Sequence, residues 1–80
     1  MRLDKYLKVS RIIKRRTVAN EACDAKHVSV NGKPARASYD VKVGDVIEIT
    51  FGASTNRFEV LSVSEYATKE SAALMFKQLN

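Results

Sequence analysis

The chain of 80 residues has little of the chemistry on which most enzymes and exported proteins depend. It contains one cysteine, one histidine, one proline, three glycines and no tryptophan. The single Cys23 excludes an internal disulfide and a cysteine cluster for metal, as is typical of proteins in a reducing cytosol. We also find no phosphate-cradling glycine loop, nucleophile–base pair or metal-ligand spacing. We therefore expect no enzymatic activity and no cofactor.

Long apolar segments are missing as well. No run approaches the roughly 18 residues that a membrane span requires, and the charged start does not resemble a signal peptide. We therefore expect a cytoplasmic protein that uses no membrane. Hydrophobic residues make up 45% of the chain and charged residues 29%, which is typical of a folded domain. The length predicts a single domain over residues 1–80, with a small core and modest stability.

Acidic residues are scarce in the first half of the chain. Residues 1–40 hold ten basic and four acidic side chains, a net charge of +6, whereas residues 41–80 hold four and five, a net charge of −1. A basic half joined to a nearly neutral half indicates one face directed at a polyanion. Nucleic acid is the simplest such partner.

Half of all basic residues lie in the first 16 positions: Arg2, Lys5, Lys8, Arg11, Lys14, Arg15 and Arg16. At 3.6 residues per turn, Leu3, Tyr6 and Leu7 fall on an apolar face, and most of the charged residues fall opposite. The pattern predicts an amphipathic helix that ends near Arg11. It is followed by a basic corner, which we define as residues 14–16.

A second helix is expected after the basic corner, with Thr17 as its N-cap and an end near Ala25. Val18, Ala22 and Ala25, with Ala19 beside them, would form its buried face. The N-terminus of a helix carries partial positive charge and free N–H groups. The corner and the start of this helix are therefore expected to attract a phosphate together.

Several residues in the basic half have a structural interpretation that we favour. Tyr6 belongs to the apolar face, so a core position is favoured over stacking on a base. Asp4 is expected to pair with Lys8 or to orient a neighbouring arginine. Cys23 is interpreted as a small packing residue and His27 as a residue at a strand edge, since no partner for either is spaced to form a site.

The remaining chain alternates as strands do. Val28–Val30 leads into the turn Asn31-Gly32, and Pro34 indicates that the returning strand lies at an edge or starts after this residue. Further strands are expected over residues 46–51 and 57–64, with a polar loop at 52–56, a bulge or strand end near residue 61 and a helix over 68–80. The order of two helices, about four strands and a helix predicts an α+β fold with a small antiparallel sheet.

Three motifs together resemble a known family. R-L-D-K-Y-L at residues 2–7, V-S-V-N-G-K at 28–33 and V-x-x-G-D-x-I at 41–47 are similar to the S-four-type RNA-binding domain, named after ribosomal protein S-four and also called the alpha-L motif. The resemblance covers about residues 1–51, which we expect to be the RNA-binding core, with a strand and the final helix over 57–80. The length is similar to that of the small stand-alone members in bacteria, the RqcP-type (YabO-type) factors above all and also the fifteen-kilodalton heat-shock protein.

The resemblance implies a non-enzymatic role on the large ribosomal subunit that is obstructed by peptidyl-tRNA. It implies binding to rRNA and tRNA, and support of the factor RqcH as that factor adds alanines to stalled chains. We expect a monomer in this role. The residues expected to contact RNA are Arg2, Lys5, Lys8, Arg11, Lys14, Arg15, Arg16, Thr17 and Lys33.

Two other functions remain open on the sequence. One is a general rRNA-binding, heat-shock or subunit-assembly factor, which would bind empty subunits equally well. The other is a protein-interaction or membrane-surface module that uses the basic amphipathic first helix. The apolar face of that helix is needed for the core, which disfavours the second alternative.

Overall fold

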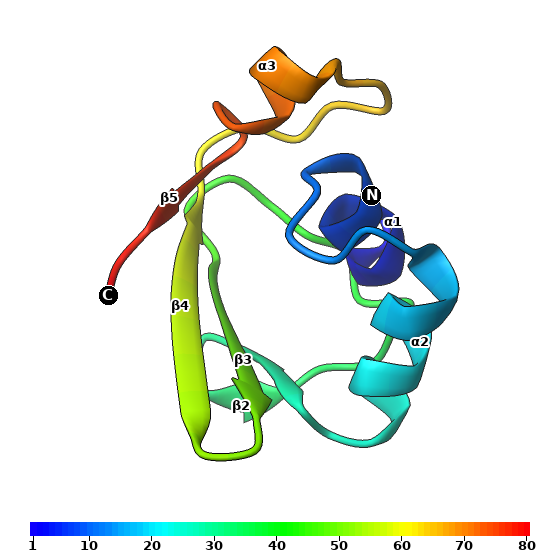
Figure 1. The fold of residues 1–80 in the computed structure, drawn as a ribbon, viewed down its shortest axis with the longest axis vertical. Coiled ribbons are helices and arrows are strands. Elements are labelled where there is room, and N and C mark those ends of the chain that lie inside the picture. The colour runs from blue at the N-terminus through cyan, green and yellow to red at the C-terminus, as the bar shows by residue number, and fades with distance from the viewer.

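Two helices lie on one side of the molecule and an antiparallel sheet on the other, in a computed structural model that describes residues 1–80 (Figure 1). The elements follow in the order α1 (Leu3–Val9), α2 (Arg16–Asp24), β1 (Val28–Val30), β2 (Lys33–Pro34), β3 (Val46–Phe51), β4 (Ser54–Val60), α3 (Lys69–Ala72) and β5 (Phe76–Gln78). The strands form one sheet in the order β2-β1-β3-β4-β5, with every neighbouring pair antiparallel. The α+β class is therefore confirmed, with a fifth strand that the sequence did not predict.

The core lies between α1, α2 and the inner face of the sheet, and it contains 16 buried hydrophobic residues. Leu3, Tyr6 and Leu7 are fully buried, which confirms the predicted apolar face of α1. The Tyr6 hydroxyl donates a hydrogen bond of 2.8 Å to the carbonyl of Met75, so this ring is a core residue with its polar end satisfied. Cys23 is also buried, and burial raises the pKa of its thiol to about 11, as expected for a packing residue.

The second helix differs from the prediction in its start and in its buried face. Arg15 occupies the N-cap position, so Thr17 lies inside the first turn and its prediction as the cap was wrong. The buried face consists of Ala19, Ala22 and Cys23, whereas Val18 is 41% exposed. Ala19 and Ala22 are thus buried as predicted, whereas Val18 and Ala25 are not, because the contact with α1 selects the side of the helix that carries Ala19 and Cys23.

The hairpin between β1 and β2 confirms the turn prediction. Asn31 and Gly32 both have positive φ angles, 53° and 83°, which is the backbone that a two-residue hairpin turn requires. Pro34 lies in β2 at the edge of the sheet, where its missing N–H leaves no gap in the hydrogen-bond ladder.

The next hairpin is longer than predicted. β4 begins at Ser54, so the expected loop over 52–56 is reduced to the short turn between Phe51 and Ser54. β4 ends at Val60, in agreement with the expected strand end, and not at Ser64. Ile47 and Ile49 are buried as predicted, but Phe51 at the end of β3 is 49% exposed because the core does not extend to this turn.

The prediction of a final helix over residues 68–80 was largely wrong. Thr68 caps a helix as predicted, and its hydroxyl accepts the N–H of Ser71, but α3 ends at Ala72. The chain then reverses and forms β5 on the outer edge of β4, with Phe76 opposite Val60. The helical spacing of apolar residues over 72–79 is overridden because β4 offers an unpaired edge whose N–H and C=O groups need partners.

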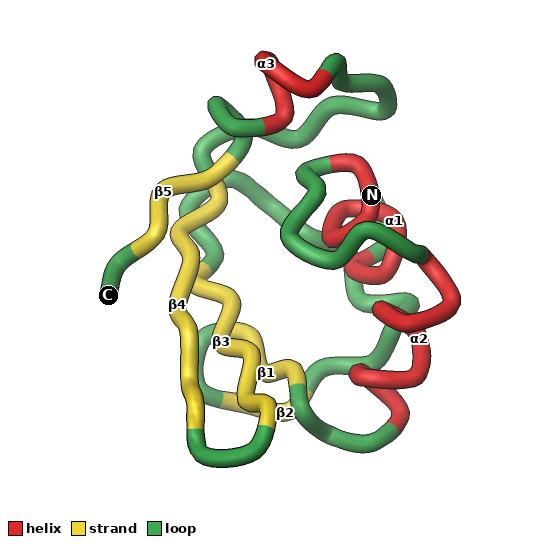
Figure 2. Tube along the Cα trace, in the orientation of Figure 1, coloured by secondary structure: helices red, strands yellow, loops and turns green.

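The path of the chain is easiest to follow in the tube view, where the short α3 interrupts a long connection between β4 and β5 (Figure 2). This connection passes above α1 rather than along the sheet. None of the three helices has the length and apolar character that crossing a membrane would require.

Candidate nucleic-acid interface

A buried carboxylate joins the first and last basic residues of positions 2–16. Asp4 of α1 accepts hydrogen bonds from the side chains of Arg2 at 3.1 and 3.4 Å, of Arg16 at 3.5 Å and of Asn20 at 3.3 Å, and it forms an ion pair with Arg16 at 3.3 Å. The backbone N–H of Lys5 adds a fourth donor at 2.8 Å. We call Arg2, Asp4, Arg16 and Asn20 the Asp4 cluster. It places two guanidinium groups, 14 positions apart in the sequence, around one carboxylate.

The Asp4 cluster combines a buried negative charge with two positive charges that face the solvent. Burial alone would raise the pKa of Asp4, but the hydrogen bonds from Arg2, Asn20, Arg16 and the N–H of Lys5 outweigh it and lower the pKa. The carboxylate is therefore ionised at neutral pH. About half of the surface of the side chains of Arg2 and Arg16 remains exposed. Each guanidinium has five N–H donors, so both retain donors for an external phosphate.

The start of α2 adds backbone donors beside this cluster. No side chain caps the helix, and Arg16, Thr17 and Val18 of its first turn are all exposed. The first residues of a helix have N–H groups without partners inside the helix, and these groups attract anions. Lys14 and Arg15 of the basic corner are exposed and make no ion pair.

Lys8 and Arg11 continue the basic surface along α1. Both are exposed and free of ion pairs, as an RNA contact requires. Arg11 follows the C-cap Ser10 and has a φ of 64°, a left-handed backbone that glycine adopts more readily than arginine. Lys5 differs from its neighbours because its ammonium is paired with the carboxylate of Glu65.

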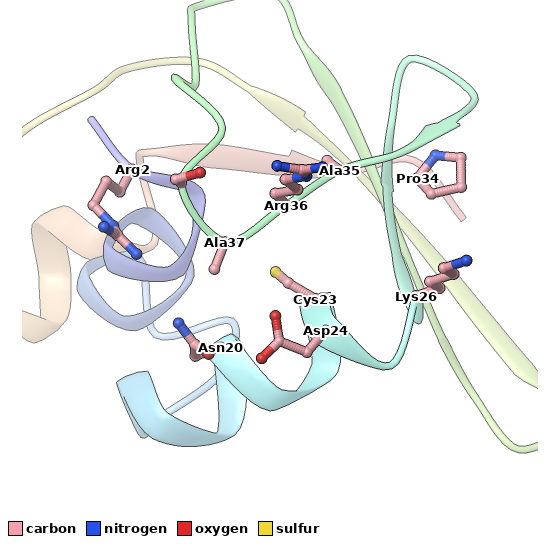
Figure 3. Close-up of a pocket in the computed structure, with 10 residues that line it drawn as sticks. Arg2, Asn20, Cys23, Asp24, Lys26, Pro34, Ala35, Arg36 and Ala37 are labelled. Atoms are coloured by element: carbon pink, nitrogen blue, oxygen red, sulfur yellow. The ribbon is translucent and has the colours of Figure 1, made fainter.

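Arginine and lysine also border a groove between α2 and the loop that follows β2 (Figure 3). Asn20, Cys23 and Asp24 line one wall, and Ala35, Arg36 and Ala37 line the other, with Arg2 at one end. Lys26, at the opposite end, has a φ of 63° and is exposed. The groove has a volume of about 500 Å³.

Lys33 lies in β2, next to the turn at Asn31 and Gly32, and is exposed. The turn is fixed by Asp45, which accepts hydrogen bonds from Asn31 at 3.0 Å, from the Tyr39 hydroxyl at 2.9 Å and from the N–H of Lys42 at 3.0 Å. We call Asn31, Tyr39, Lys42 and Asp45 the Asp45 cluster. It connects the two sequence motifs N-G-K and G-D, which explains why they occur together.

The structure thus brings most of the predicted residues onto the helical side of the molecule. Arg2 and Arg16 meet at Asp4, and Thr17 lies at the exposed start of α2, whereas Lys33 belongs to the hairpin. Of the two roles expected for Asp4, the pair with Lys8 does not form, and the orientation of a neighbouring arginine is found at Arg2 and also at Arg16. Sequence reasoning missed the contribution of Asn20, and it left Lys26 and Arg36 out of the site. The clustering of basic residues was the signal for Lys26 and Arg36, whereas nothing local pointed to Asn20.

The folded chain presents the alpha-L arrangement that the motifs suggested, and it matches the S4 domain over residues 1–47. The protein belongs to the S4 domain family. It is 53% identical over 77 residues to the RQC P-site tRNA stabilizing factor of Streptococcus pneumoniae, covering 96% of this chain and 88% of that protein. The factor of the same name from Bacillus subtilis is 49% identical over 76 residues, covering 95% of this chain and 88% of that protein.

A solved structure has the same fold. The trimeric structure of Vibrio cholerae Heat Shock Protein 15 is similar with a TM-score of 0.89 and 25% sequence identity, over 98% of this chain and 80% of that chain. The resemblance to the RNA-binding family and to its small stand-alone members is therefore confirmed.

Proposed function

We propose that this protein binds RNA on the large ribosomal subunit and stabilises tRNA in the P site during ribosome-associated quality control. The names of its relatives support a role with P-site tRNA, and membership of the S4 domain family supports RNA binding. The single observation that carries the proposal from the structure is the Asp4 cluster, which directs Arg2 and Arg16 beside the uncapped start of α2. Arginine forks and helix N–H groups are both suited to phosphate oxygens.

The contact surface in this proposal consists of the exposed basic residues of the helical side. Arg2 and Arg16 would bind phosphates from fixed positions, and the lysines and arginines of α1 and the basic corner would follow the RNA backbone. Lys33 would reach a phosphate from the hairpin. Lys5 has a smaller part than the sequence suggested, because Glu65 neutralises it and a phosphate would have to displace this carboxylate.

We further propose the partners that the family resemblance implied. The protein would bind rRNA and peptidyl-tRNA of an obstructed large subunit as a monomer, in the cytoplasm, and would hold the tRNA while RqcH adds alanines to the stalled chain. The role is positional, without bond chemistry. If about five phosphates are neutralised, the slope of log affinity against log salt should be roughly −3 to −5. A slope near zero would contradict an electrostatic mechanism.

The first experiment is co-sedimentation of the full chain with large subunits that carry peptidyl-tRNA and with empty ones. We expect enrichment on the obstructed subunits and loss of that binding in Arg16→Ala. The matched control is Arg57→Ala, because Arg57 is similarly exposed and is also paired with an acid, Glu48, at 2.8 Å, but lies in the sheet. The control variant should bind as the wild type does.

The alternative outcomes separate the competing functions. Equal binding to both kinds of subunit would favour a general rRNA-binding or assembly factor, and would leave the RNA interface in place. Absence of binding to either kind would contradict the ribosomal proposal. Circular dichroism of Arg16→Ala should match the wild type, because the side chain lies at the surface and its loss leaves no cavity.

A further inference from the structure

The connection between β4 and α3 is brought onto the basic side of the molecule, although it belongs to the nearly neutral half of the sequence. It passes above α1 (Figure 1). The carboxylate of Glu65 pairs with the ammonium of Lys5 in α1. Within the connection, the Ser64 hydroxyl donates a hydrogen bond of 2.8 Å to the carbonyl of Tyr66. The ion pair links the connection to the first helix, and the hydrogen bond spans residue 65 within the connection.

This placement presents an aromatic side chain beside basic ones. Tyr66 is 88% exposed and makes no aromatic contact. With Glu65 and Ala67 it lines a small pocket of about 170 Å³, whose other wall is formed by Lys8 and Val9 of α1 and by Arg11, which follows that helix. Single exposed apolar residues are common on proteins and need no explanation. Tyr66 is different because its neighbours across the pocket are two cations without acidic partners.

We propose that Tyr66 is a stacking platform for an unpaired base of the bound RNA, whose backbone phosphates lie against Lys8 and Arg11. This inference rests on the proposed RNA-binding function and extends its interface to the C-terminal part of the chain. A positively charged surface that carries an aromatic ring is the arrangement by which proteins bind single-stranded or looped nucleic acid. Stacking tolerates any base, so the site selects unpaired nucleotides rather than a sequence.

The charges at the pocket favour RNA over a protein as the occupant. Lys8 and Arg11 give the pocket two cations, and the one carboxylate that lines it, that of Glu65, is already paired with Lys5. A protein that bound this pocket would need an acidic patch to match Lys8 and Arg11. It would also have to leave the neighbouring basic surface accessible to RNA. RNA can occupy the whole site as one ligand, because each nucleotide supplies a phosphate for the cations and a base for the aromatic ring.

The test uses the full chain and a fluorescein-labelled RNA hairpin with an unpaired loop, measured by fluorescence anisotropy at several salt concentrations. Tyr66→Ala should weaken binding by roughly 5- to 150-fold, the range that stacking contributes per base. Tyr66→Phe should bind as the wild type does, and Tyr66→Leu should bind as poorly as the alanine variant. The matched control is Leu74→Ala, which removes an exposed apolar side chain from the same part of the chain, away from Lys8 and Arg11.

The salt dependence separates the ring from the charges. Tyr66→Ala should leave the slope of log affinity against log salt unchanged, whereas Arg11→Gln should reduce it by about 0.7 to 0.9 for one lost phosphate contact.

Wild-type affinity in all Tyr66 variants would overturn the inference, as would binding of Tyr66→Leu equal to that of Tyr66→Phe, which would indicate a plain apolar contact. A Tyr66 variant that binds RNA normally but loses a protein partner would also overturn it. Failure of the wild type to bind either the hairpin or large subunits would instead contradict the proposed function itself.

Discussion

Asp4 and Asp45 are both buried carboxylates, with 2% and 9% of their surface exposed, and each collects donors from segments far apart in the sequence. The donors are of different kinds. Asp4 is bound by two arginines, an asparagine and a backbone N–H, whereas Asp45 is bound by an asparagine, a tyrosine hydroxyl and a backbone N–H and has no charged donor. The Asp4 cluster lies in the basic half and the Asp45 cluster joins the turns of the sheet.

The difference in donors indicates which cluster is suited to bind phosphate. The donors to Asp45 are neutral, and they offer a ligand no charge once their hydrogen bonds to the carboxylate are made. The Asp45 cluster therefore stabilises the fold and is not suited to bind an anion. A guanidinium retains several N–H groups after pairing with Asp4, and its charge is held at the surface in a set orientation. A buried carboxylate that holds exposed cations therefore prepares a phosphate site, whereas one that holds neutral donors does not.

Acidification acts on the Asp4 and Asp45 clusters at once, so among the changes considered it should lower the free energy of unfolding the most. Hydrogen bonds lower the pKa of both Asp4 and Asp45 below the ordinary 3.8, in spite of the opposing effect of burial. A carboxyl whose pKa is lower in the folded state stabilises the fold above its unfolded pKa and ceases to do so as pH falls through the folded value. The free energy of unfolding should therefore be constant near neutral pH and should decrease below about pH 4. Urea titrations followed by circular dichroism at each pH measure it, and constant stability down to pH 2 would contradict the ionised clusters.

Asp45→Ala should be the most damaging single change, and its effect should be on stability alone. The substitution leaves the donors of Asn31, Tyr39 and Lys42 without their acceptor, at a cost of about 2 kcal/mol in the free energy of unfolding. The control is Asp40→Ala, because Asp40 is exposed and solvent screens its ion pair with the N-terminal ammonium, so its loss should change the free energy of unfolding much less. Urea unfolding gives both values. Weaker RNA binding by the folded Asp45→Ala protein would show that the two clusters are not separate in function.

Asp4→Asn should produce the reverse result, a loss of binding that exceeds the loss of stability. The variant is more positive by one charge, which by itself would strengthen binding to RNA. Without the carboxylate, however, Arg2 and Arg16 are no longer held in place, and we expect about tenfold weaker binding, equivalent to about 1.4 kcal/mol. Asp24→Asn is the matched control because it changes the charge equally on the surface of α2, and it should bind at least as well as the wild type. Equal affinities of the two variants would remove the orienting role of Asp4.

Arg11→Gly should have the smallest effect and should separate binding from stability within the basic half. Glycine adopts the φ of 64° found at this position without strain, so we expect an increase of about 0.5 to 1 kcal/mol in the free energy of unfolding. Affinity for RNA should decrease because a cation is lost. Arg11→Gln is the control, with the same loss of affinity and no gain in stability. A destabilised Arg11→Gly would indicate that the side chain packs on the fold.

Local patterns in the sequence predicted much of this molecule correctly. The apolar face of α1, the turn at Asn31 and Gly32 and the edge position of Pro34 depend on neighbouring residues and on backbone preferences that act within a few positions. The basic surface could be predicted for the same reason, since the basic residues of positions 2–16 are close in sequence. Where a contact across the molecule decided the outcome, as at Thr17 and in the final helix, the prediction was wrong.

The sequence by itself determined that the chain has a positive half, an α+β fold and a hairpin, because charge, helical period and turn chemistry are local properties. Only the tertiary structure decided that residues 76–78 form a strand, because the edge of β4 outweighs the helical spacing of their apolar side chains. The tertiary structure also decided that Asp4 joins Arg2 to Arg16, and that Tyr66 lies beside Lys8 and Arg11. These pairings bring together residues up to 58 positions apart, for which no periodicity within one segment carries a signal.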